Sequence, residues 1–242
     1  MLKIILLILH VLSALLQLIF FVFLSQQQRM YLVQHWAKTL LTILRIKVIV
    51  EGDEQVLHSQ AGYLMVANHI SWLDIHVINS LHPITFVAKS DVAQWPIFGW
   101  IAKQIGTIFI KRSQLSDLKR VIQMIKSKIK QHQAICIFPE GTSSDGRQVL
   151  EFRSNLFEVV AQTPHQIIPL AIQYQEGGKY SERAAFIGDM GLIDSIKQVM
   201  KSNSLVAYVY LAPPINADKS RQELALQSRE AIVASKLFDR YN

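Results

Sequence analysis

From Arg45 onward, short apolar runs alternate with amphipathic segments, and this alternation restricts the fold more than any other feature of the chain. Several of the runs are continuously apolar, as expected for strands that are covered on both faces. The expected strands are Lys47–Val50, Tyr63–Ala67, Thr85–Ala88, Thr107–Ile110, Ala134–Phe138, Ile167–Gln173 and Leu205–Leu211. The expected helices are Leu73–Ser80, Gln114–Gln131, Ser154–Ala161, Leu192–Lys201 and Lys219–Leu237. The pattern predicts an α/β fold with a mostly parallel or mixed sheet covered by helices.

An uncharged apolar run, Ile4–Leu24, precedes this region. About 20 apolar residues suffice to cross the hydrocarbon core of a bilayer as a helix. A signal peptide is the alternative, but its apolar part is usually only about 7–15 residues long and ends at a small-residue cleavage site. Here the run ends in Leu24-Ser25-Gln26, which offers no such site. We therefore expect a retained membrane helix, either spanning the bilayer or lying half-sunk in it.

The segment Tyr31–Leu44 has helical apolar spacing and predicts a second helix, which packs on the first helix or the core, or rests in the headgroup layer. We expect residues 1–44 to anchor the chain to a membrane and residues 45–242 to form the α/β domain. Positive residues favour the cytoplasmic side of a membrane. One lysine, Lys3, precedes the apolar run, whereas Arg29, Lys38, Arg45 and Lys47 follow it. The domain is therefore expected at an inner cell membrane, facing the cytoplasm.

The chain has a formal net charge of +7 and a low charged fraction of 18%. A basic balance suits an anionic lipid surface, nucleic acid or a phosphorylated substrate. The sequence contains no nucleic-acid-binding motif, so we expect no nucleic-acid partner. Its single cysteine, Cys136, excludes an internal disulfide and a multi-cysteine zinc site.

The strongest chemical signal is the segment Asn68-His69-Ile70-Ser71-Trp72-Leu73-Asp74, directly after the expected strand Tyr63–Ala67. Catalytic groups commonly follow strand ends in α/β folds. A histidine transfers protons near neutral pH, and a carboxylate on its other ring nitrogen fixes the tautomer. The spacing predicts His69 as a catalytic base that Asp74 orients.

There are three other interpretations of this segment, and one of them is compatible with catalysis. Ser71 and Asp74 also form an S-x-x-D helix-capping pattern, which is compatible with catalysis. A metal-dependent hydrolase would use His69, Asp74 and His76 as ligands, although no partner motif accompanies them. A catalytically inactive lipid-binding protein is the third, and the intact His69–Asp74 pair argues against it.

Two further segments carry polar groups at strand ends. The loop Phe138–Gly146 places Glu140 after a strand, where it can meet a substrate hydroxyl. A serine hydrolase is excluded because its nucleophile elbow needs G-x-S-x-G, whereas four residues separate Gly141 from Gly146. The segment Gly106–Arg112 ends in Lys111 and Arg112, which would bind a phosphate or carboxylate or simply cap the strand.

Taken together and in this order, these segments resemble the phospholipid and glycerol acyltransferase family, including its bacterial 1-acylglycerol-3-phosphate acyltransferases. The resemblance covers Lys47–Gln173. The family blocks are N-H-x-S-x-x-D, G-x-I-F-I-x-R, F-P-E-G-T-R-S and an apolar strand with a proline. The residues that match them are Asn68, His69, Ser71 and Asp74; Gly106, Ile108, Phe109, Ile110 and Arg112; Phe138, Pro139, Glu140, Gly141 and Thr142; and Ile168, Pro169, Leu170 and Ala171.

The resemblance implies an enzyme that moves a fatty acyl group from acyl-CoA or acyl carrier protein to a lipid hydroxyl, without a metal or organic cofactor. His69 would deprotonate the acceptor and Asp74 would orient His69. Arg112 would hold the anionic head of the acceptor, and Pro169 would lie on the donor side. The full set of implied substrate-binding residues is Asn68, Ser71, Lys111, Arg112, Glu140, Gly141, Thr142 and Pro169. Membrane lipids and the acyl donor are the implied partners.

One position departs from the family pattern, because Ser143 stands where an arginine usually binds the acceptor phosphate. This variant resembles a subgroup that includes lyso-ornithine lipid acyltransferases. Arg147 or Arg153 is a candidate replacement for the missing charge. The first expectation is acylation of the sn-2 hydroxyl of lysophosphatidate to phosphatidate in phospholipid biosynthesis. The alternative acceptor is a lyso-ornithine lipid or another lysolipid.

Overall fold

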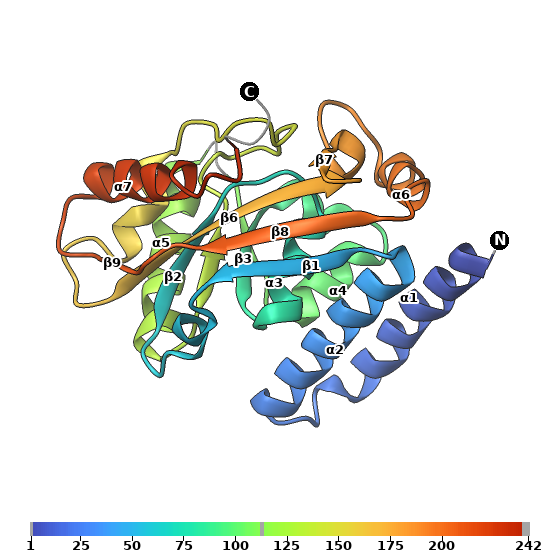
Figure 1. Ribbon diagram of the computed structural model, residues 1–242. Coiled ribbons are helices and arrows are strands. Elements are labelled where there is room, and N and C mark those ends of the chain that lie inside the picture. Colours follow the sequence, from blue (N-terminus) through green and yellow to red (C-terminus); the bar gives the residue numbers. More distant parts are fainter. Residues whose placement is uncertain (1, 112–113, 239–242) are drawn as a thin grey trace.

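The computed structural model describes residues 2–111 and 114–238, which form a mixed sheet covered by helices on both faces (Figure 1). Within these residues the sheet has nine strands, and its main path runs in the order β1-β8-β6-β2-β5-β3-β4. The strands on this path are β1 (Lys47–Gly52), β2 (Tyr63–Ala67), β3 (Thr85–Lys89), β4 (Ile108–Ile110), β5 (Ile135–Ile137), β6 (Gln166–Glu176) and β8 (Leu205–Leu211). Two short strands, β7 (Lys179–Tyr180) and β9 (Ile215–Asn216), pair with β6.

Strand direction determines where the functional loops lie. Strands β6, β2, β5, β3 and β4 run parallel to one another, whereas β8 is antiparallel to β6. Because β1 is parallel to β8, these two strands reverse the direction at one side of the sheet. The loops after β2, β5, β3 and β4 therefore leave from the same edge of the sheet.

Side chains of the buried strands alternate between two separate cores. In β2, Tyr63, Met65 and Ala67 enter one core, and Leu64 and Val66 enter the other. This alternation follows from the two-residue period of a strand, so a continuously apolar strand needs cover on both faces. The expected α/β fold with a mixed sheet is confirmed.

Helices from different parts of the chain cover the two faces. One core includes buried residues of α2 (Gln26–Leu44), α3 (Leu73–Leu81) and α6 (Leu192–Met200). The other includes buried residues of α5 (Leu115–Lys130), α7 (Arg221–Val233) and the 3-10 helix Ser154–Val159. The sequence predicted an ordinary helix over Ser154–Ala161, and the tighter 3-10 form replaces it. The short helix α4 (Phe98–Gln104), three further 3-10 turns, β7 and β9 were not predicted. The three turns are Glu54–His58, Ser90–Gln94 and Glu182–Ala184.

The N-terminal helices form an antiparallel pair beside the sheet (Figure 1, blue). Helix α1 (Leu2–Phe21) ends before the expected Leu24, and α2 begins five residues before the expected Tyr31. The earlier start of α2 has a local cause, because Ser25 and Gln28 form a reciprocal capping box at its first turn. Helix α2 also buries Leu40, Leu41 and Leu44 in the domain core. The division into an anchor, residues 1–44, and a domain, residues 45–242, stays a prediction.

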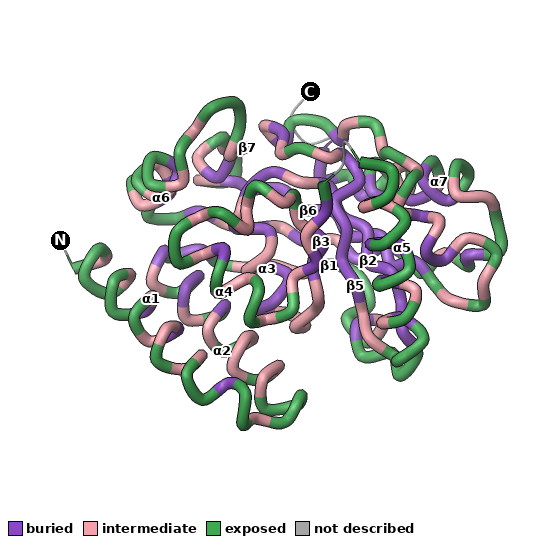
Figure 2. The backbone as a smooth tube through the Cα atoms, turned by 180° about the vertical axis from the view of Figure 1, so that it is seen from behind, coloured by how far each residue is buried: buried purple, intermediate pink, exposed green. Residues whose placement is uncertain are grey.

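Helix α1 is attached to the rest of the chain along its length. At its start, the ammonium group of Lys3 donates to the carbonyl of Ser202 at 3.0 Å, just beyond α6. In its middle, the His10 Nε2 atom lies 3.0 Å from the carbonyl oxygen of Trp36, whose indole N–H donates to the His10 carbonyl. The other side of α1 is exposed (Figure 2). Within the described residues, α1 alone is long and apolar enough to cross a membrane.

Candidate active site

The loop between β2 and α3 places His69 and Asp74 in direct contact. The Nδ1 atom of His69 lies 2.8 Å from Oδ2 of Asp74. The side chain of Asp74 is fully buried, whereas 23% of the His69 side chain is exposed. Since a carboxylate only accepts hydrogen bonds, the Nδ1 atom carries the ring proton and donates a hydrogen bond to Asp74. The Nε2 atom of His69 then has its lone pair available, as a general base requires.

Asp74 is held by three further hydrogen bonds. The backbone N–H groups of Ile70 and Ser71 donate to its Oδ2 atom at 2.7 and 2.9 Å. The hydroxyl group of Tyr174 in β6 donates to Oδ1 at 2.8 Å. Burial and the neighbouring Asp74 charge raise the pKa of Tyr174 well above its ordinary value, so this hydroxyl keeps its proton. The sequence carried no signal for Tyr174, which lies in β6 one residue beyond the predicted strand Ile167–Gln173.

The capping interpretation is half right. The first residue of α3 follows Trp72, which makes no side-chain cap. Asp74 does bind the backbone N–H groups that precede the helix, as an acidic residue in a capping box does. The hydroxyl of Ser71 is buried and has no hydrogen-bond partner among the residues that the structure describes. Asp74 therefore serves both the local turn and the contact with His69.

Asn68 fastens this loop to the sheet. Its side-chain amide donates to the carbonyl of Ile172 at 2.9 Å and accepts from the Ile172 N–H at 2.8 Å. The residue is fully buried, so its amide continues the pairing of β2 with β6 beyond the last strand residue. The resemblance implied a contact between Asn68 and substrate, whereas here both ends of the amide are used within the protein.

The loop after β5 lies against His69. The rings of His69 and Phe138 are stacked with their centroids 4.1 Å apart. The backbone N–H of His69 donates to Oε1 of Glu140 at 3.4 Å, and the other oxygen, Oε2, is buried and has no partner among the described residues. Burial, with a smaller contribution from the Asp74 charge, raises the pKa of Glu140 to about 8. At neutral pH its carboxyl group is therefore mostly protonated, and a protonated Oε2 can donate a hydrogen bond.

Backbone contacts keep the two loops in register. The N–H and the hydroxyl of Ser144 both donate to the carbonyl of His69, at 2.8 and 3.2 Å. Gly146 has a positive φ of 86°, and a Cβ atom there would lie 2.6 Å from Cδ1 of Ile70. A residue with a side chain would therefore be strained at this position and would force the side chain of Ile70 to move.

Ser143 binds the protein instead of facing an open phosphate site. Its hydroxyl donates to the carbonyl of Phe186, and the Phe186 N–H donates to the carbonyl of Ile70 at 2.9 Å. The candidate replacement Arg147 donates to Glu182 at 2.6 Å and lies over the ring of Tyr180. Its guanidinium group is thus already paired.

The remaining residues that the resemblance implied in substrate binding differ in how far they are buried. Thr142 is exposed, and Gly141 has a φ of 81° that suits its turn. Pro169 is buried within β6, opposite Val66 of β2. Lys111 is exposed after β4, which is three strands from β2 and therefore roughly 14 Å away at ordinary strand spacing. Arg112 lies outside the described residues.

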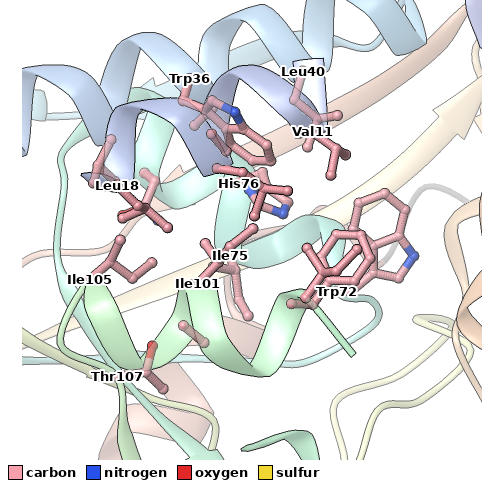
Figure 3. A pocket seen from close by; sticks show the side chains of 18 of the residues that line it. Val11, Leu18, Trp36, Leu40, Trp72, Ile75, His76, Ile101, Ile105 and Thr107 are labelled. Atoms are coloured by element: carbon pink, nitrogen blue, oxygen red, sulfur yellow. The ribbon is translucent and has the colours of Figure 1, made fainter. Parts of the chain in front are cut away.

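A cavity of about 480 Å³ begins beside the loop between β2 and α3 and lies between helices α1, α2, α3 and α4 (Figure 3). Trp72, three residues after His69, forms part of its wall and is held by a 2.9 Å hydrogen bond to Ser195. The wall is almost entirely aliphatic and aromatic, and includes Leu18, Ile75 and Ile101. Such a lining suits a hydrocarbon chain, and the volume is in the range of about 300–1,000 Å³ that small-ligand sites have.

His76 lies in this wall beside Trp36, with 5.4 Å between ring centroids (Figure 3). Burial lowers the pKa of His76 to about 4, so the imidazole is neutral at physiological pH. His69 and Asp74 are in contact, but the described residues include no group of three histidine, cysteine, aspartate or glutamate side chains, with His76 or otherwise, that could hold a metal ion. The geometry gives the metal-dependent hydrolase no ligand set.

Comparisons with known proteins agree with this architecture. The model of the family described as "Acyltransferase" matches residues 47–173, and the chain belongs to this family. It is an acyltransferase of the glycerolipid and lysolipid type. The crystal structure of the 1-acyl-sn-glycerophosphate (LPA) acyltransferase PlsC from Thermotoga maritima shares the fold. Its TM-score is 0.65 at 22% sequence identity, over 97% of this chain and 95% of that one.

Curated relatives carry two different acceptor names. A lyso-ornithine lipid O-acyltransferase from Pseudomonas aeruginosa is 31% identical over 205 residues, covering 84% of this chain and 78% of the relative. A 1-acyl-sn-glycerol-3-phosphate acyltransferase from Neisseria gonorrhoeae is 28% identical over 169 residues, covering 69% of this chain and 66% of the relative. Both are similar to this chain, and their names differ in the lipid that accepts the acyl group.

Proposed function

We propose that this protein transfers a fatty acyl group from a thioester, either acyl-CoA or acyl carrier protein, to a hydroxyl group of a lysolipid. The observation that carries the proposal is the contact between His69 Nδ1 and buried Asp74, which leaves Nε2 as the basic nitrogen. The apolar cavity that begins at Trp72 is further support, because its lining suits the acyl chain of one of the two substrates.

The chemistry needs one base and no change in oxidation state. Nε2 of His69 takes the proton of the acceptor hydroxyl while the oxygen attacks the thioester carbonyl carbon. The tetrahedral intermediate collapses, the carbon–sulfur bond breaks, and the thiolate leaves with the proton from His69. The products are an ester and a free thiol. Asp74 stabilises the imidazolium that forms in between.

For the acceptor we favour a lyso-ornithine lipid. Ser143 occupies the position of the usual phosphate-binding arginine, and its hydroxyl is bonded to Phe186. The neighbouring Arg147 is paired with Glu182. The other candidate, Arg153, is exposed and its backbone N–H donates to the carbonyl of Pro139 at 3.0 Å, so among these three residues a phosphate acceptor would have to use Arg153. The extent of similarity to the Pseudomonas aeruginosa relative supports the same acceptor.

Lysophosphatidate acylated at its sn-2 hydroxyl, yielding phosphatidate, is the second candidate. The exposed Lys111 after β4 and the similarity to the Neisseria gonorrhoeae relative favour it.

The deciding experiment offers both acceptors to the purified full-length protein and measures acyl transfer with each donor. It is repeated with Ser143→Arg, which adds a cation, and with Ser143→Ala, which removes only the hydrogen bond to Phe186. If lyso-ornithine lipid is the acceptor, Ser143→Arg loses more activity than Ser143→Ala, because the added charge repels the ornithine ammonium. A wild-type preference for lysophosphatidate that Ser143→Arg strengthens would establish the second candidate instead.

The protein is also proposed to act at the inner cell membrane with its domain on the cytoplasmic side. Both the start and the middle of α1 contact the rest of the chain, through Lys3 and His10. A helix held along the domain in this way supports an orientation within one leaflet rather than across the bilayer.

A further inference from the structure

Four of the large apolar side chains that are exposed outside the N-terminal helices come from segments beside the cavity. They are Ile97 at 46%, Trp100 at 44%, Ile187 at 42% and Ile193 at 68% of full exposure, and we call them the rim patch. They come from three segments: the start of α4, the loop after Ala185, and the first turn of α6. A large apolar surface of this kind marks a site of contact with a protein or a membrane.

The rim patch lies where the cavity reaches the surface. Ile97 is exposed and also lines the cavity, and Leu192, the neighbour of Ile193, lines it as well. The rings of Trp95 and Phe186 are in edge contact, with 5.9 Å between centroids, which brings the segment of Ile97 beside that of Ile187.

The backbone presents Ile97 in an uncommon conformation. Its φ and ψ are 65° and −58°, and the N–H of Phe98 donates to the carbonyl of Pro96 at 2.6 Å, which defines a γ-turn of the rare, strained type. A branched residue at positive φ is a true outlier, and such strain clusters at functional positions. The turn is held from behind, because a Cβ atom on Gly99 would lie 2.5 Å from the carbonyl oxygen of Ala93.

The surroundings of the rim patch indicate a lipid. Helix α4 contacts α1, whose outer side exposes a continuous series of apolar residues. The outer series comprises Ile4, Ile5, Ile8, Leu9, Leu12, Leu16, Ile19 and Phe20. About one turn beyond Trp100 and Ile193 lie the exposed cations Lys103 and Lys197, of which Lys197 is paired with Asp194 at 3.2 Å. Apolar residues with a tryptophan and flanked by lysines are the composition that binds the interface of an anionic bilayer.

We propose that the rim patch inserts into the acyl layer of a lipid bilayer as a second membrane contact, separate from α1, and seats the mouth of the cavity in the lipid. The lipid-soluble substrate then enters without crossing water. The contact does not depend on which lysolipid is the acceptor, and it is measured without catalysis.

The first test measures depth in the membrane. Cys136 is buried, and burial raises the pKa of its thiol well above its ordinary value, so it reacts slowly with thiol reagents. Single Trp100→Cys and Ile193→Cys variants of the full-length protein are labelled with a fluorophore and mixed with vesicles of phosphatidylcholine and phosphatidylglycerol containing brominated lipid. The matched control is Leu226→Cys, because Leu226 is 56% exposed but lies on α7, which covers the other core.

The expected result is strong quenching at positions 100 and 193 and little quenching at position 226. Quenching at 100 and 193 no greater than at 226 would overturn the proposal, whether the labels are all quenched or all unquenched. Failure of the wild-type protein to bind the vesicles would overturn it as well.

The second test measures affinity. The double substitution Trp100→Gln and Ile193→Asn is expected to lower the vesicle partition coefficient on the order of tenfold, because two apolar side chains no longer enter the lipid. Leu226→Asn should leave it unchanged. Thermal unfolding verifies that both variants are folded. A folded double variant with the wild-type partition coefficient would contradict the proposal.

Discussion

The hydroxyl oxygen of Tyr174 lies 2.8 Å from Oδ1 of Asp74, although 100 residues separate the two in the sequence. His69 uses the other carboxylate oxygen, Oδ2. Tyr174 therefore fixes the rotation of the carboxylate group that orients the proposed base, from a strand on which neither of the other two residues lies. We assign Tyr174 a positioning role.

Removing this hydroxyl should weaken both stability and catalysis without abolishing either. For Tyr174→Phe we expect a loss of about 1–3 kcal/mol in the free energy of unfolding, since a buried hydrogen bond to a charged acceptor is lost. The fall in kcat should be smaller than in Asp74→Asn. Denaturant unfolding and steady-state kinetics measure the two effects. A Tyr174→Phe enzyme as impaired in kcat as Asp74→Asn would mean that Tyr174 does more than position Asp74.

His69→Ala should remove the base while leaving the fold intact. The ring is partly exposed, and its main contacts are with Asp74 and Phe138. General-base assistance accounts for about 10²–10⁴ in rate, so kcat should fall by that order. Single-turnover assays with a folded variant, verified by circular dichroism, provide the measurement. Near-wild-type turnover would exclude His69 as the base.

Asp74→Asn should affect activity and stability together. The amide can present an N–H to His69 and so favour the wrong tautomer, for which a loss on the order of 10⁴ in kcat is known in comparable triads. It also weakens acceptance from the N–H groups of Ile70 and Ser71. Thermal unfolding and kinetics on the same sample test both effects. A variant that loses only stability would leave Asp74 as a capping residue alone.

Glu140→Gln should change how stability depends on pH. The pKa of Glu140 is raised to about 8, so between its ordinary pKa near 4.5 and pH 8 the folded protein binds a proton that the unfolded chain releases. Stability attributable to this group therefore falls as pH rises through that window. Relative to the wild type, Glu140→Gln should gain stability at pH 8 and show little difference at pH 5. Unfolding free energies at both values test this, and a difference independent of pH would contradict the assigned protonation state.

Filling the cavity should shorten the acyl chains that the protein accepts. Ile101 lines the cavity, and Ile101→Trp would occupy part of its volume of about 480 Å³. We expect use of long acyl chains to fall at least about tenfold while short chains are retained, since overpacking affects only ligands that reach the filled region. Leu226→Trp on α7 is the control. Equal losses for short and long chains would show that the cavity does not hold the chain.

The local sequence pattern was enough to predict the α/β class of fold and the pairing of His69 with Asp74. The buried strands read as continuous apolar runs, and β2 and β8 have the bounds expected from the sequence. His69 and Asp74 are five residues apart across one turn, so a short loop brings them together without help from distant segments. The sequence alone also supported the N-terminal apolar helix, because hydrocarbon contact requires an unbroken run without charges.

Only the tertiary structure decided which distant groups complete the site. Tyr174 reaches Asp74 because β6 lies beside β2, and that strand order depends on packing over two cores that no local window contains. The raised pKa of Glu140 likewise comes from burial, which a loop sequence rich in small polar residues does not reveal. The cavity and the strained turn at Ile97 arise where four helices meet, and their contacts join residues that are remote along the chain. Sequence patterns determine local conformation, whereas desolvation and long-range hydrogen bonds depend on how the elements are assembled.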